Sequence, residues 1–203
     1  MSVDTNLIKK PYKREKFTSQ QIAELARCTV DPKYFMLEHC YIQHPTRGRM
    51  KFALYDYQQR LVDVYHNNRY SIAMLPRQTG KSTCAAGYLL WYAMFNSDQT
   101  ILIAAHKYSG AQEIMQRIRF AYETLPDHIR AGVTAYNKGS MEFDNGSRII
   151  AQATTENTGR GLSLSLVYLD EFAFVPPRIA KEFWTSLSPT LSTGGKCMIT
   201  STP

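Results

Sequence analysis

The most informative stretch of the chain is Tyr70-Ser-Ile-Ala-Met-Leu75, followed by Pro76-Arg-Gln-Thr-Gly-Lys-Ser82 and then by the largely apolar run Thr83–Phe95. This succession predicts a buried strand, a tight turn and a helix. A turn that ends in Gly-Lys-Ser at the start of a helix can hold a nucleoside triphosphate, because backbone N–H groups and the helix N-terminus face the phosphates. Lys81 would reach the β- and γ-phosphates, and the Ser82 hydroxyl would bind Mg²⁺.

The match to a phosphate-binding loop is incomplete, because Leu75 stands where the usual loop has its first glycine. The alternative is a strand, turn and helix with a solvated lysine. A second motif favours ATP binding: the apolar run from Leu164 ends in the adjacent carboxylates Asp170 and Glu171. In a nucleotide-hydrolysing site, Asp170 would hold Mg²⁺ through its water shell and Glu171 would orient the attacking water. The two motifs in this order predict an ATPase.

Composition is consistent with this interpretation. A length of 203 residues suits one α/β domain with a small appendage, and the net charge of +7 favours an anionic partner such as nucleic acid. No stretch is long and apolar enough for a membrane, and the four cysteines are too few for a disulfide scaffold, so we expect a reducing compartment and no membrane partner. The N-terminal basic residues are either a DNA-contacting arm or a solvated, disordered end; they are Lys9, Lys10, Lys13, Arg14 and Lys16.

Periodicity and turn residues predict the other elements. Helices are expected over residues 18–27, 32–39, 57–68, 109–125 and 178–187, and strands over 51–54, 100–105 and 196–202. An Asn145-Gly146 turn predicts an antiparallel hairpin around residues 141–151. Strands that alternate with helices imply a mostly parallel, doubly wound sheet.

Three further features fit an ATPase. Gln58 lies upstream of the loop, where its amide can pair with adenine, although an ordinary helix start explains it equally well. Arg160 lies between two glycines ahead of the acidic strand, so we expect it on a surface loop at the nucleotide edge, where an arginine can stabilise transition-state charge. The hydroxyls of Thr200, Ser201 and Thr202 end the last strand and would sense the γ-phosphate from a neighbouring strand.

Five motifs together resemble the large terminase subunit of tailed bacteriophages, specifically of the contractile-tailed type. They are Arg77–Ser82, Asn137–Ser147, Arg160-Gly161, Leu169–Phe174 and Thr200–Pro203. The likeness covers about residues 50–203. It implies a P-loop NTPase fold of the ASCE or RecA-like type, with an added antiparallel hairpin and a small helical N-terminal region. In that family, ATP hydrolysis drives double-stranded DNA into a preformed capsid.

The resemblance also implies roles for single residues. The nucleotide is expected to contact Gln58, Arg77, Gln78, Thr79, Gly80, Lys81, Ser82 and Thr83. The metal ligands are expected to be Ser82 and Asp170, the catalytic residues Glu171, Arg160 and Arg77, and the coupling residues Thr200, Ser201 and Thr202. Arg160 is the candidate for a finger that acts in trans, and Arg77 for an arginine that acts in cis. The implied cofactors are ATP and Mg²⁺.

The implied partners are double-stranded DNA, the portal protein and the small terminase subunit. The resemblance implies a homo-oligomeric ring when docked on the procapsid, a monomer when alone, and a location in the host cytoplasm. Residues 1–49 are expected to form a small basic, helical region, and residues 50–203 an ATPase core truncated after the coupling motif. Family members continue into an RNase H-like nuclease, whose cluster of acids is not visible here, so no DNA cutting is expected.

Two alternatives remain at this point. A superfamily 2 helicase shares the glutamine, the phosphate loop and the Asp-Glu pair, but it needs a second RecA-like lobe and usually has Ser-Ala-Thr where Ser201-Thr-Pro stands. The other alternative is a fragment that binds nucleotide without turnover and serves only in assembly.

Overall fold

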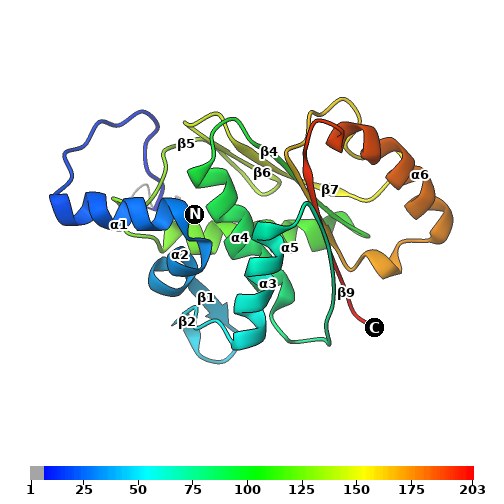
Figure 1. Ribbon diagram of the computed structural model, residues 1–203, viewed down its shortest axis with the longest axis horizontal. Coiled ribbons are helices and arrows are strands. Elements are labelled where there is room, and N and C mark those ends of the chain that lie inside the picture. Colours follow the sequence, from blue (N-terminus) through cyan, green and yellow to red (C-terminus); the bar gives the residue numbers. More distant parts are fainter. Residues whose placement is uncertain (1–6) are drawn as a thin grey trace.

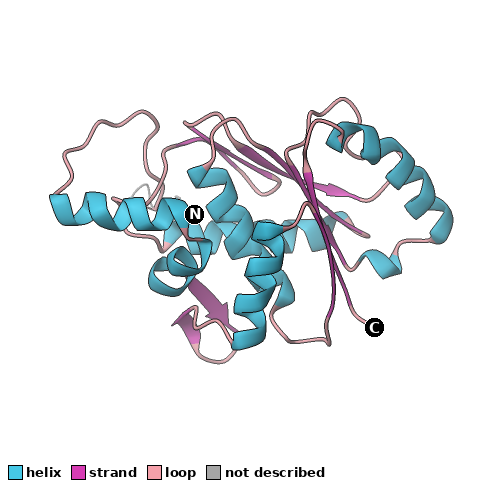
Figure 2. Ribbon diagram, in the orientation of Figure 1, coloured by secondary structure: helices cyan, strands magenta, loops and turns pink. Residues whose placement is uncertain are grey.

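The computed structural model describes residues 7–203. A central sheet separates a large group of helices on one face from helix α6 on the other (Figures 1 and 2). The helices are α1 (Ser19–Val30), α2 (Pro32–His39), α3 (Asp56–Asn67), α4 (Lys81–Phe95), α5 (Tyr108–Glu123) and α6 (Pro177–Leu187), with short 3₁₀ turns at Phe172–Phe174 and Ser188–Leu191. The strands are β1 (Tyr41–His44), β2 (Gly48–Lys51), β3 (Tyr70–Met74), β4 (Thr100–Ala105), β5 (Val133–Tyr136), β6 (Ser140–Phe143), β7 (Arg148–Ala153), β8 (Leu166–Asp170) and β9 (Lys196–Ser201).

The large sheet has the order β3-β9-β8-β4-β7-β6-β5. Strands β3, β9, β8, β4 and β7 run parallel, and β6 and β5 extend the sheet in antiparallel fashion. The mostly parallel sheet and the β6–β7 hairpin around Asn145-Gly146 are therefore confirmed. Strand β5 is an element that the sequence pattern did not predict.

Strand β3 differs from the prediction of a buried strand. It pairs only with β9 among the described strands, so it lies at an edge of the sheet. The side chains of Ile72 and Met74 are 72% and 64% exposed. A short apolar run in the sequence is compatible with both a central strand and an edge strand. The position of the strand in the sheet depends on which strands pair with it, and the run itself does not show this.

The region before α3 is a hairpin followed by an irregular segment. The strand expected near residues 51–54 lies earlier in the chain: β1 and β2 pair around a turn at residues 45–47, and β2 ends at Lys51. The predicted domain boundary between residues 49 and 50 falls inside β2. Cys28, Phe35 and Met36 of the first two helices are buried in the same hydrophobic core as α4 and α5.

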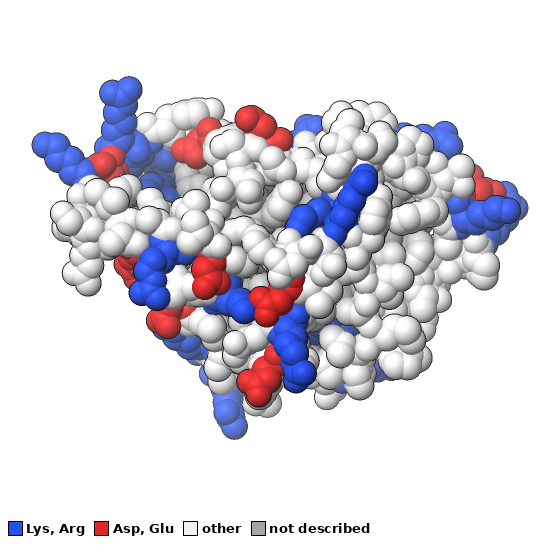
Figure 3. Space-filling view, viewed as in Figure 1, with Lys and Arg blue, Asp and Glu red and all other residues white. Residues whose placement is uncertain are grey.

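The basic N-terminal segment is attached to the rest of the protein, which corrects the expectation of a solvated, disordered end for the described residues. Lys9 Nζ donates to the Asp127 carbonyl at 2.9 Å and pairs with Glu15 at 3.1 Å. The Val133 N–H donates to the Lys9 carbonyl at 3.1 Å, and Lys13 also pairs with Glu15. Figure 3 shows basic side chains with acidic ones among them at this end of the molecule.

Two global properties bear on the environment of the protein. All four cysteines are buried, unpaired thiols, and burial raises the pKa of Cys28 and Cys84 to about 12. Within residues 7–203, no helix combines the length and apolar character needed to cross a bilayer.

Candidate nucleotide site

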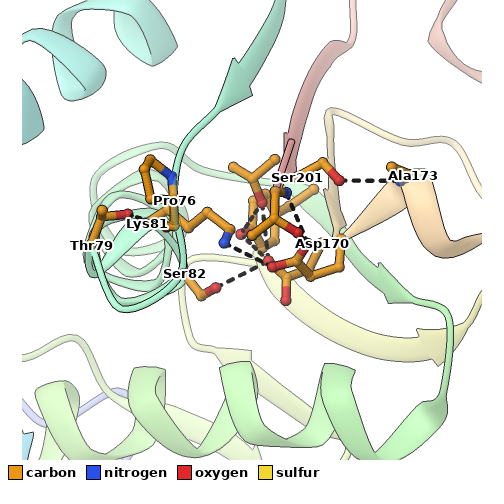
Figure 4. Close-up of polar contacts among 11 residues, drawn as sticks. Pro76, Thr79, Lys81, Ser82, Asp170, Ala173 and Ser201 are labelled. Atoms are coloured by element: carbon orange, nitrogen blue, oxygen red, sulfur yellow. Dashed lines mark hydrogen bonds and ion pairs between the residues drawn. The ribbon is translucent and has the colours of Figure 1, made fainter.

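The candidate site lies where three neighbouring parallel strands end. Because β3, β9 and β8 run in the same direction, their carboxyl ends meet at one edge of the sheet. The loop after β3, the acidic pair after β8 and the hydroxyl residues at the end of β9 therefore come together. Figure 4 shows Lys81 and Ser82 directed toward Asp170 from the loop side, with Ser201 on the strand beside them.

The loop between β3 and α4 has a backbone suited to close approach of an anion. Gly80 has φ +72° and caps α4. Gln78 adopts φ +63°, a backbone conformation that residues other than glycine rarely take. A Cβ on Gly80 would lie 2.7 Å from Gln58 Nε2, so no larger residue fits without movement. Thr79 Oγ1 donates to the Pro76 carbonyl at 2.9 Å and closes the turn.

Gln58 supports this loop from below. Its side chain is 4% exposed; Nε2 donates to the Thr79 carbonyl at 3.0 Å, and Oε1 accepts from the Tyr55 N–H at 3.0 Å. The Tyr57 hydroxyl donates to the same Thr79 carbonyl at 2.6 Å. These contacts make Gln58 part of the scaffold of the loop, and its predicted contact with adenine stays a prediction.

The lysine of the loop pairs with the second acid. Lys81 is 6% exposed, and its Nζ lies 2.7 Å from Glu171 Oε1. The other carboxylate oxygen accepts hydrogen bonds from the Thr202 N–H at 3.0 Å and from Thr202 Oγ1 at 3.1 Å. Burial raises the pKa of Glu171, but the hydrogen bonds and charge of Lys81 and the Thr202 bonds outweigh it and leave the pKa below its usual value. Glu171 is therefore held as a carboxylate.

The first acid lies in a network of hydroxyl groups. Asp170 Oδ1 accepts from Ser82 Oγ at 3.1 Å, from the Tyr168 hydroxyl at 2.7 Å and from Thr200 Oγ1 at 3.0 Å. Burial and the nearby Asp170 charge raise the pKa of Tyr168 well above its usual value, so its hydroxyl stays protonated. Tyr168 was missed because it stands in the apolar run. Its position two residues before Asp170, on the same face of β8, was the available signal.

The donor set around Ser82 and Asp170 fits a magnesium ion. Mg²⁺ prefers hard oxygen ligands, usually one or two from the protein together with water and substrate phosphates. A hydroxyl and a carboxylate 3.1 Å apart beside a phosphate-binding loop supply that set. The structure thus brings together the two residues that were expected to bind the metal.

The β9 residues connect the two strands that carry these motifs. Thr200 is fully buried and reaches Asp170, whereas Thr202 reaches Glu171. The Ser201 carbonyl accepts from the Leu75 N–H at 3.0 Å, and Ser201 Oγ accepts from the Ala173 N–H at 3.3 Å. Thr200 and Thr202 therefore contact the acidic pair directly, whereas Ser201 lies beside the loop. The coupling role predicted for these residues stays a prediction.

Other predicted site residues do not converge here. Arg77 and Gln78 are exposed, and no hydrogen bond or ion pair involves the Arg77 side chain among the described residues. Thr83 is half-buried and lines a cavity of about 370 Å³ between α4, α5 and the β1–β2 hairpin. The nucleotide contacts predicted for these residues stay predictions.

Arg160 lies in the loop between β7 and β8. It is exposed, and its Nε donates to Ser186 Oγ at 3.0 Å, in the last turn of α6. Helix α6 begins shortly after the acidic pair and advances about 14 Å between Pro177 and Ser186. Two residues earlier, Thr158 Oγ1 donates to the carbonyl of Ala153, the last residue of β7. The expected role of Arg160 at the nucleotide edge stays a prediction.

Comparison with known proteins supports the same interpretation. Residues 72–203 match the family model described as "Terminase large subunit, T4likevirus-type, N-terminal". The ATPase domain of the Thermus phage P74-26 large terminase is 22% identical with a TM-score of 0.65, over 85% of this chain and 70% of that one. The HK97 bacteriophage large terminase is 19% identical with a TM-score of 0.67, and the similarity covers 86% of this chain but 37% of that one.

A third solved structure contains a nucleotide. It is the large terminase of a thermophilic bacteriophage in complex with ADP, and it is 12% identical with a TM-score of 0.56, over 73% of this chain and 38% of that one. At these identities the likeness shows the fold of an ATPase domain, and this chain spans well under half of the HK97 protein and of the ADP-bound one. The family match covers more than half of the chain and decides against the helicase alternative. The chain therefore belongs to the family of T4-like phage large terminase subunits, the ATPases of DNA packaging, and matches the N-terminal part of that family.

Proposed function

We propose that this chain hydrolyses Mg²⁺-ATP and that this hydrolysis moves double-stranded DNA into a procapsid. The observation that carries the proposal is the meeting of two pairs at one edge of the sheet: Lys81 with Glu171, and Ser82 with Asp170. These pairs supply a cation for phosphates, oxygen ligands for a metal, and a carboxylate for an attacking water.

Each residue has a defined task in this proposal. The N–H groups at the start of α4 and Lys81 bind the phosphates, while Ser82 and Asp170 hold the metal. When bound, Mg²⁺ would neutralise part of the charge that develops on the phosphoryl oxygens. Glu171 orients the attacking water and accepts its proton, which requires that Lys81 leave Glu171 for the phosphates.

The contact between Thr202 and Glu171 suits a coupling role. After Lys81 moves to the phosphates, the two hydrogen bonds from Thr202 remain to hold the carboxylate. A change in the state of Glu171 would therefore reach the end of β9 directly. We propose that ATP hydrolysis moves the end of β9 and that this movement is transmitted to the rest of the motor.

Family membership supports the wider setting. We propose that the partners are double-stranded DNA, the portal protein and the small terminase subunit, that the active form is a ring, and that it acts in the host cytoplasm on a procapsid. We also propose that residues 1–203 contribute no nuclease activity.

Steady-state ATP hydrolysis with and without linear double-stranded DNA tests the proposal. Glu171→Gln should bind ATP like the parent chain but turn over about 10²–10⁴-fold more slowly, because the amide keeps the shape and loses the base. Asp170→Asn should instead weaken Mg²⁺-ATP binding. Glu182 offers the matched control, since it is half-buried on α6 and pairs with Arg178, so Glu182→Gln leaves the site intact. Unchanged turnover in Glu171→Gln would refute the assignment, and nucleotide binding without turnover in the parent chain would favour the assembly fragment.

A further inference from the structure

The Tyr168 hydroxyl makes a three-way contact with Asp170 and Thr200. It lies 2.7 Å from Asp170 Oδ1 and 2.8 Å from Thr200 Oγ1, and these two oxygens are 3.0 Å apart. Tyr168 and Thr200 are both 0% exposed. The three oxygen atoms therefore satisfy one another, because solvent does not reach the two hydroxyl side chains.

The available protons restrict this arrangement. An ionised carboxylate only accepts, and each hydroxyl has one proton to donate, so two protons serve three contacts. Either both hydroxyls donate to Asp170 Oδ1, or Tyr168 donates to Thr200 and Thr200 donates to Oδ1, or Thr200 donates to Tyr168 and Tyr168 donates to Oδ1. In each arrangement the Tyr168 hydroxyl is part of the hydrogen bonding that ends on the same carboxylate oxygen.

The bonds to Asp170 are all on one oxygen. Ser82, Tyr168 and Thr200 all contact Oδ1, and no hydrogen bond to Oδ2 occurs among residues 7–203. A carboxylate anchored through one oxygen cannot rotate freely about its terminal bond. The second oxygen is thereby kept available for a cation or for the water molecules around it.

We propose that Tyr168 is a positioning residue for the magnesium site: its hydroxyl fixes the orientation of Asp170 and links that orientation to Thr200 on β9. Tyr168 itself touches neither the nucleotide nor the ion. The inference rests on the proposed function, because it takes Mg²⁺ with a nucleotide as the ligand of the site.

Another tyrosine of the same core provides a matched control. Tyr65 of α3 is also 0% exposed, but its hydroxyl has no hydrogen-bond partner among the described residues. Phenylalanine keeps the ring of either residue and removes only the hydroxyl. A comparison of Tyr168→Phe with Tyr65→Phe therefore separates loss of the hydrogen bonds to Asp170 and Thr200 from loss of a buried oxygen.

The experiment measures binding of ADP to the full chain by isothermal titration calorimetry, without metal and over a series of Mg²⁺ concentrations. In Tyr168→Phe we expect metal-free affinity like that of the parent and an about tenfold smaller gain from Mg²⁺, equivalent to ~1.4 kcal/mol, as expected for a hydrogen bond to a charged group. Tyr65→Phe should keep the full gain.

The outcomes separate this inference from the proposed function. A parent chain whose ADP affinity does not respond to Mg²⁺ would overturn the proposed function itself. A responsive parent with an equally responsive Tyr168→Phe would overturn only the role of Tyr168. Equal loss of metal-free and Mg²⁺-dependent binding would also overturn it, because that pattern marks a structural residue. If Tyr168→Phe does not fold, Thr200→Val removes the other hydroxyl that contacts Asp170 Oδ1 and should show the same selective loss of the Mg²⁺ gain. A full Mg²⁺ gain in Thr200→Val would then contradict the proposal.

Discussion

At the scale of single residues, the side chains proposed to bind and hydrolyse ATP also stabilise one another in the structure. Lys81 and Glu171 neutralise each other, and Thr202 adds two hydrogen bonds to the same carboxylate. Glu171 adopts φ +49°, in the left-handed region, which is unfavourable for a residue with a side chain. Strain of this kind is retained where surrounding contacts compensate for it, and the contacts of the carboxylate provide that compensation.

The pKa of Glu171 leads to a prediction about pH. Because the pKa in the folded chain lies below the usual 4.5, the unfolded state binds the proton more readily. The contribution of Glu171 to the free energy of unfolding is therefore complete above the unfolded pKa and is lost as the pH falls through the folded pKa. Urea denaturation of the parent and of Glu171→Gln should show a difference in free energy that is constant above about pH 5 and shrinks in more acidic buffer. A difference that stays constant down to acid pH would contradict the ion pair.

Gln58 yields a prediction about base selection. Its amide has four hydrogen-bonding positions, of which the contacts to Thr79 and Tyr55 use two, so one N–H and one lone pair remain for adenine. We expect Gln58→Ala to weaken binding of both ATP and GTP because the loop loses its support. ATP should lose about 1–3 kcal/mol more, by analogy with paired contacts to a base. Competition binding of the two nucleotides measures this, and an equal loss for both would limit Gln58 to the loop.

At the scale of elements, the corner between β3 and α4 depends on what lies beneath it. The start of α3 brings Tyr57 and Gln58 under the loop, and both donate to the Thr79 carbonyl. Gly80 then caps α4 in the left-handed conformation, and a Cβ added to Gly80 would meet the Gln58 amide. The loop is therefore shaped by a helix that precedes it in sequence as well as by its own residues.

Substitution of Gly80 tests this dependence. Gly80→Ala and Gly48→Ala both place a Cβ at positive φ, which costs about 1–2 kcal/mol of stability. Only Gly80 has a neighbour in the way, because the added Cβ would lie 2.7 Å from Gln58 Nε2, whereas Gly48 has nothing within 4 Å. Gly80→Ala should therefore destabilise more than Gly48→Ala in chemical denaturation. The excess should disappear when Gln58 is also alanine, and persistence of the excess would place the conflict elsewhere.

At the scale of the whole molecule, no arginine side chain among residues 7–203 forms a hydrogen bond or ion pair with Lys81, Ser82 or the acidic pair. Arg77 is exposed, and Arg160 lies against Ser186 at the far end of α6. An arginine finger contributes about 10³–10⁵ in rate, so its supply decides whether the site turns over quickly. The exposed position of Arg160 suits delivery to a neighbouring subunit better than delivery to its own site.

Mixing of two defective variants tests delivery in trans. Arg160→Ala and Glu171→Gln should each be inactive alone, whereas a mixed ring should recover part of the activity. In such a ring, Arg160 of a Glu171→Gln subunit can act on the site of a neighbouring Arg160→Ala subunit, whose acidic pair is intact. Activity of the parent chain should also rise with protein concentration or with portal. ATP turnover of the mixtures, read with light scattering to verify assembly, measures both. If a ring forms and the variants never complement, Arg160 is a local structural residue.

Local patterns in the amino-acid sequence were enough to predict several parts of this protein. The turn from β3 into α4, the acidic end of β8 and the alternation of strands with helices follow from glycines, charges and apolar runs that are read within a few residues. The resemblance of these motifs to the large terminase was confirmed by the family match.

Which of these parts are neighbours depends on long-range packing and became clear from the three-dimensional structure. The insertion of β9 between β3 and β8 brings Thr200 and Thr202 to the acidic pair and places Thr200 beside the Tyr168 hydroxyl. It also leaves β3 at the edge of the sheet. The same long-range packing forms the β1–β2 hairpin and carries Arg160 to Ser186. The order of strands in the sheet depends on how the crossover helices and the buried faces pack over the whole chain. A pattern of residues within a short segment does not contain this information.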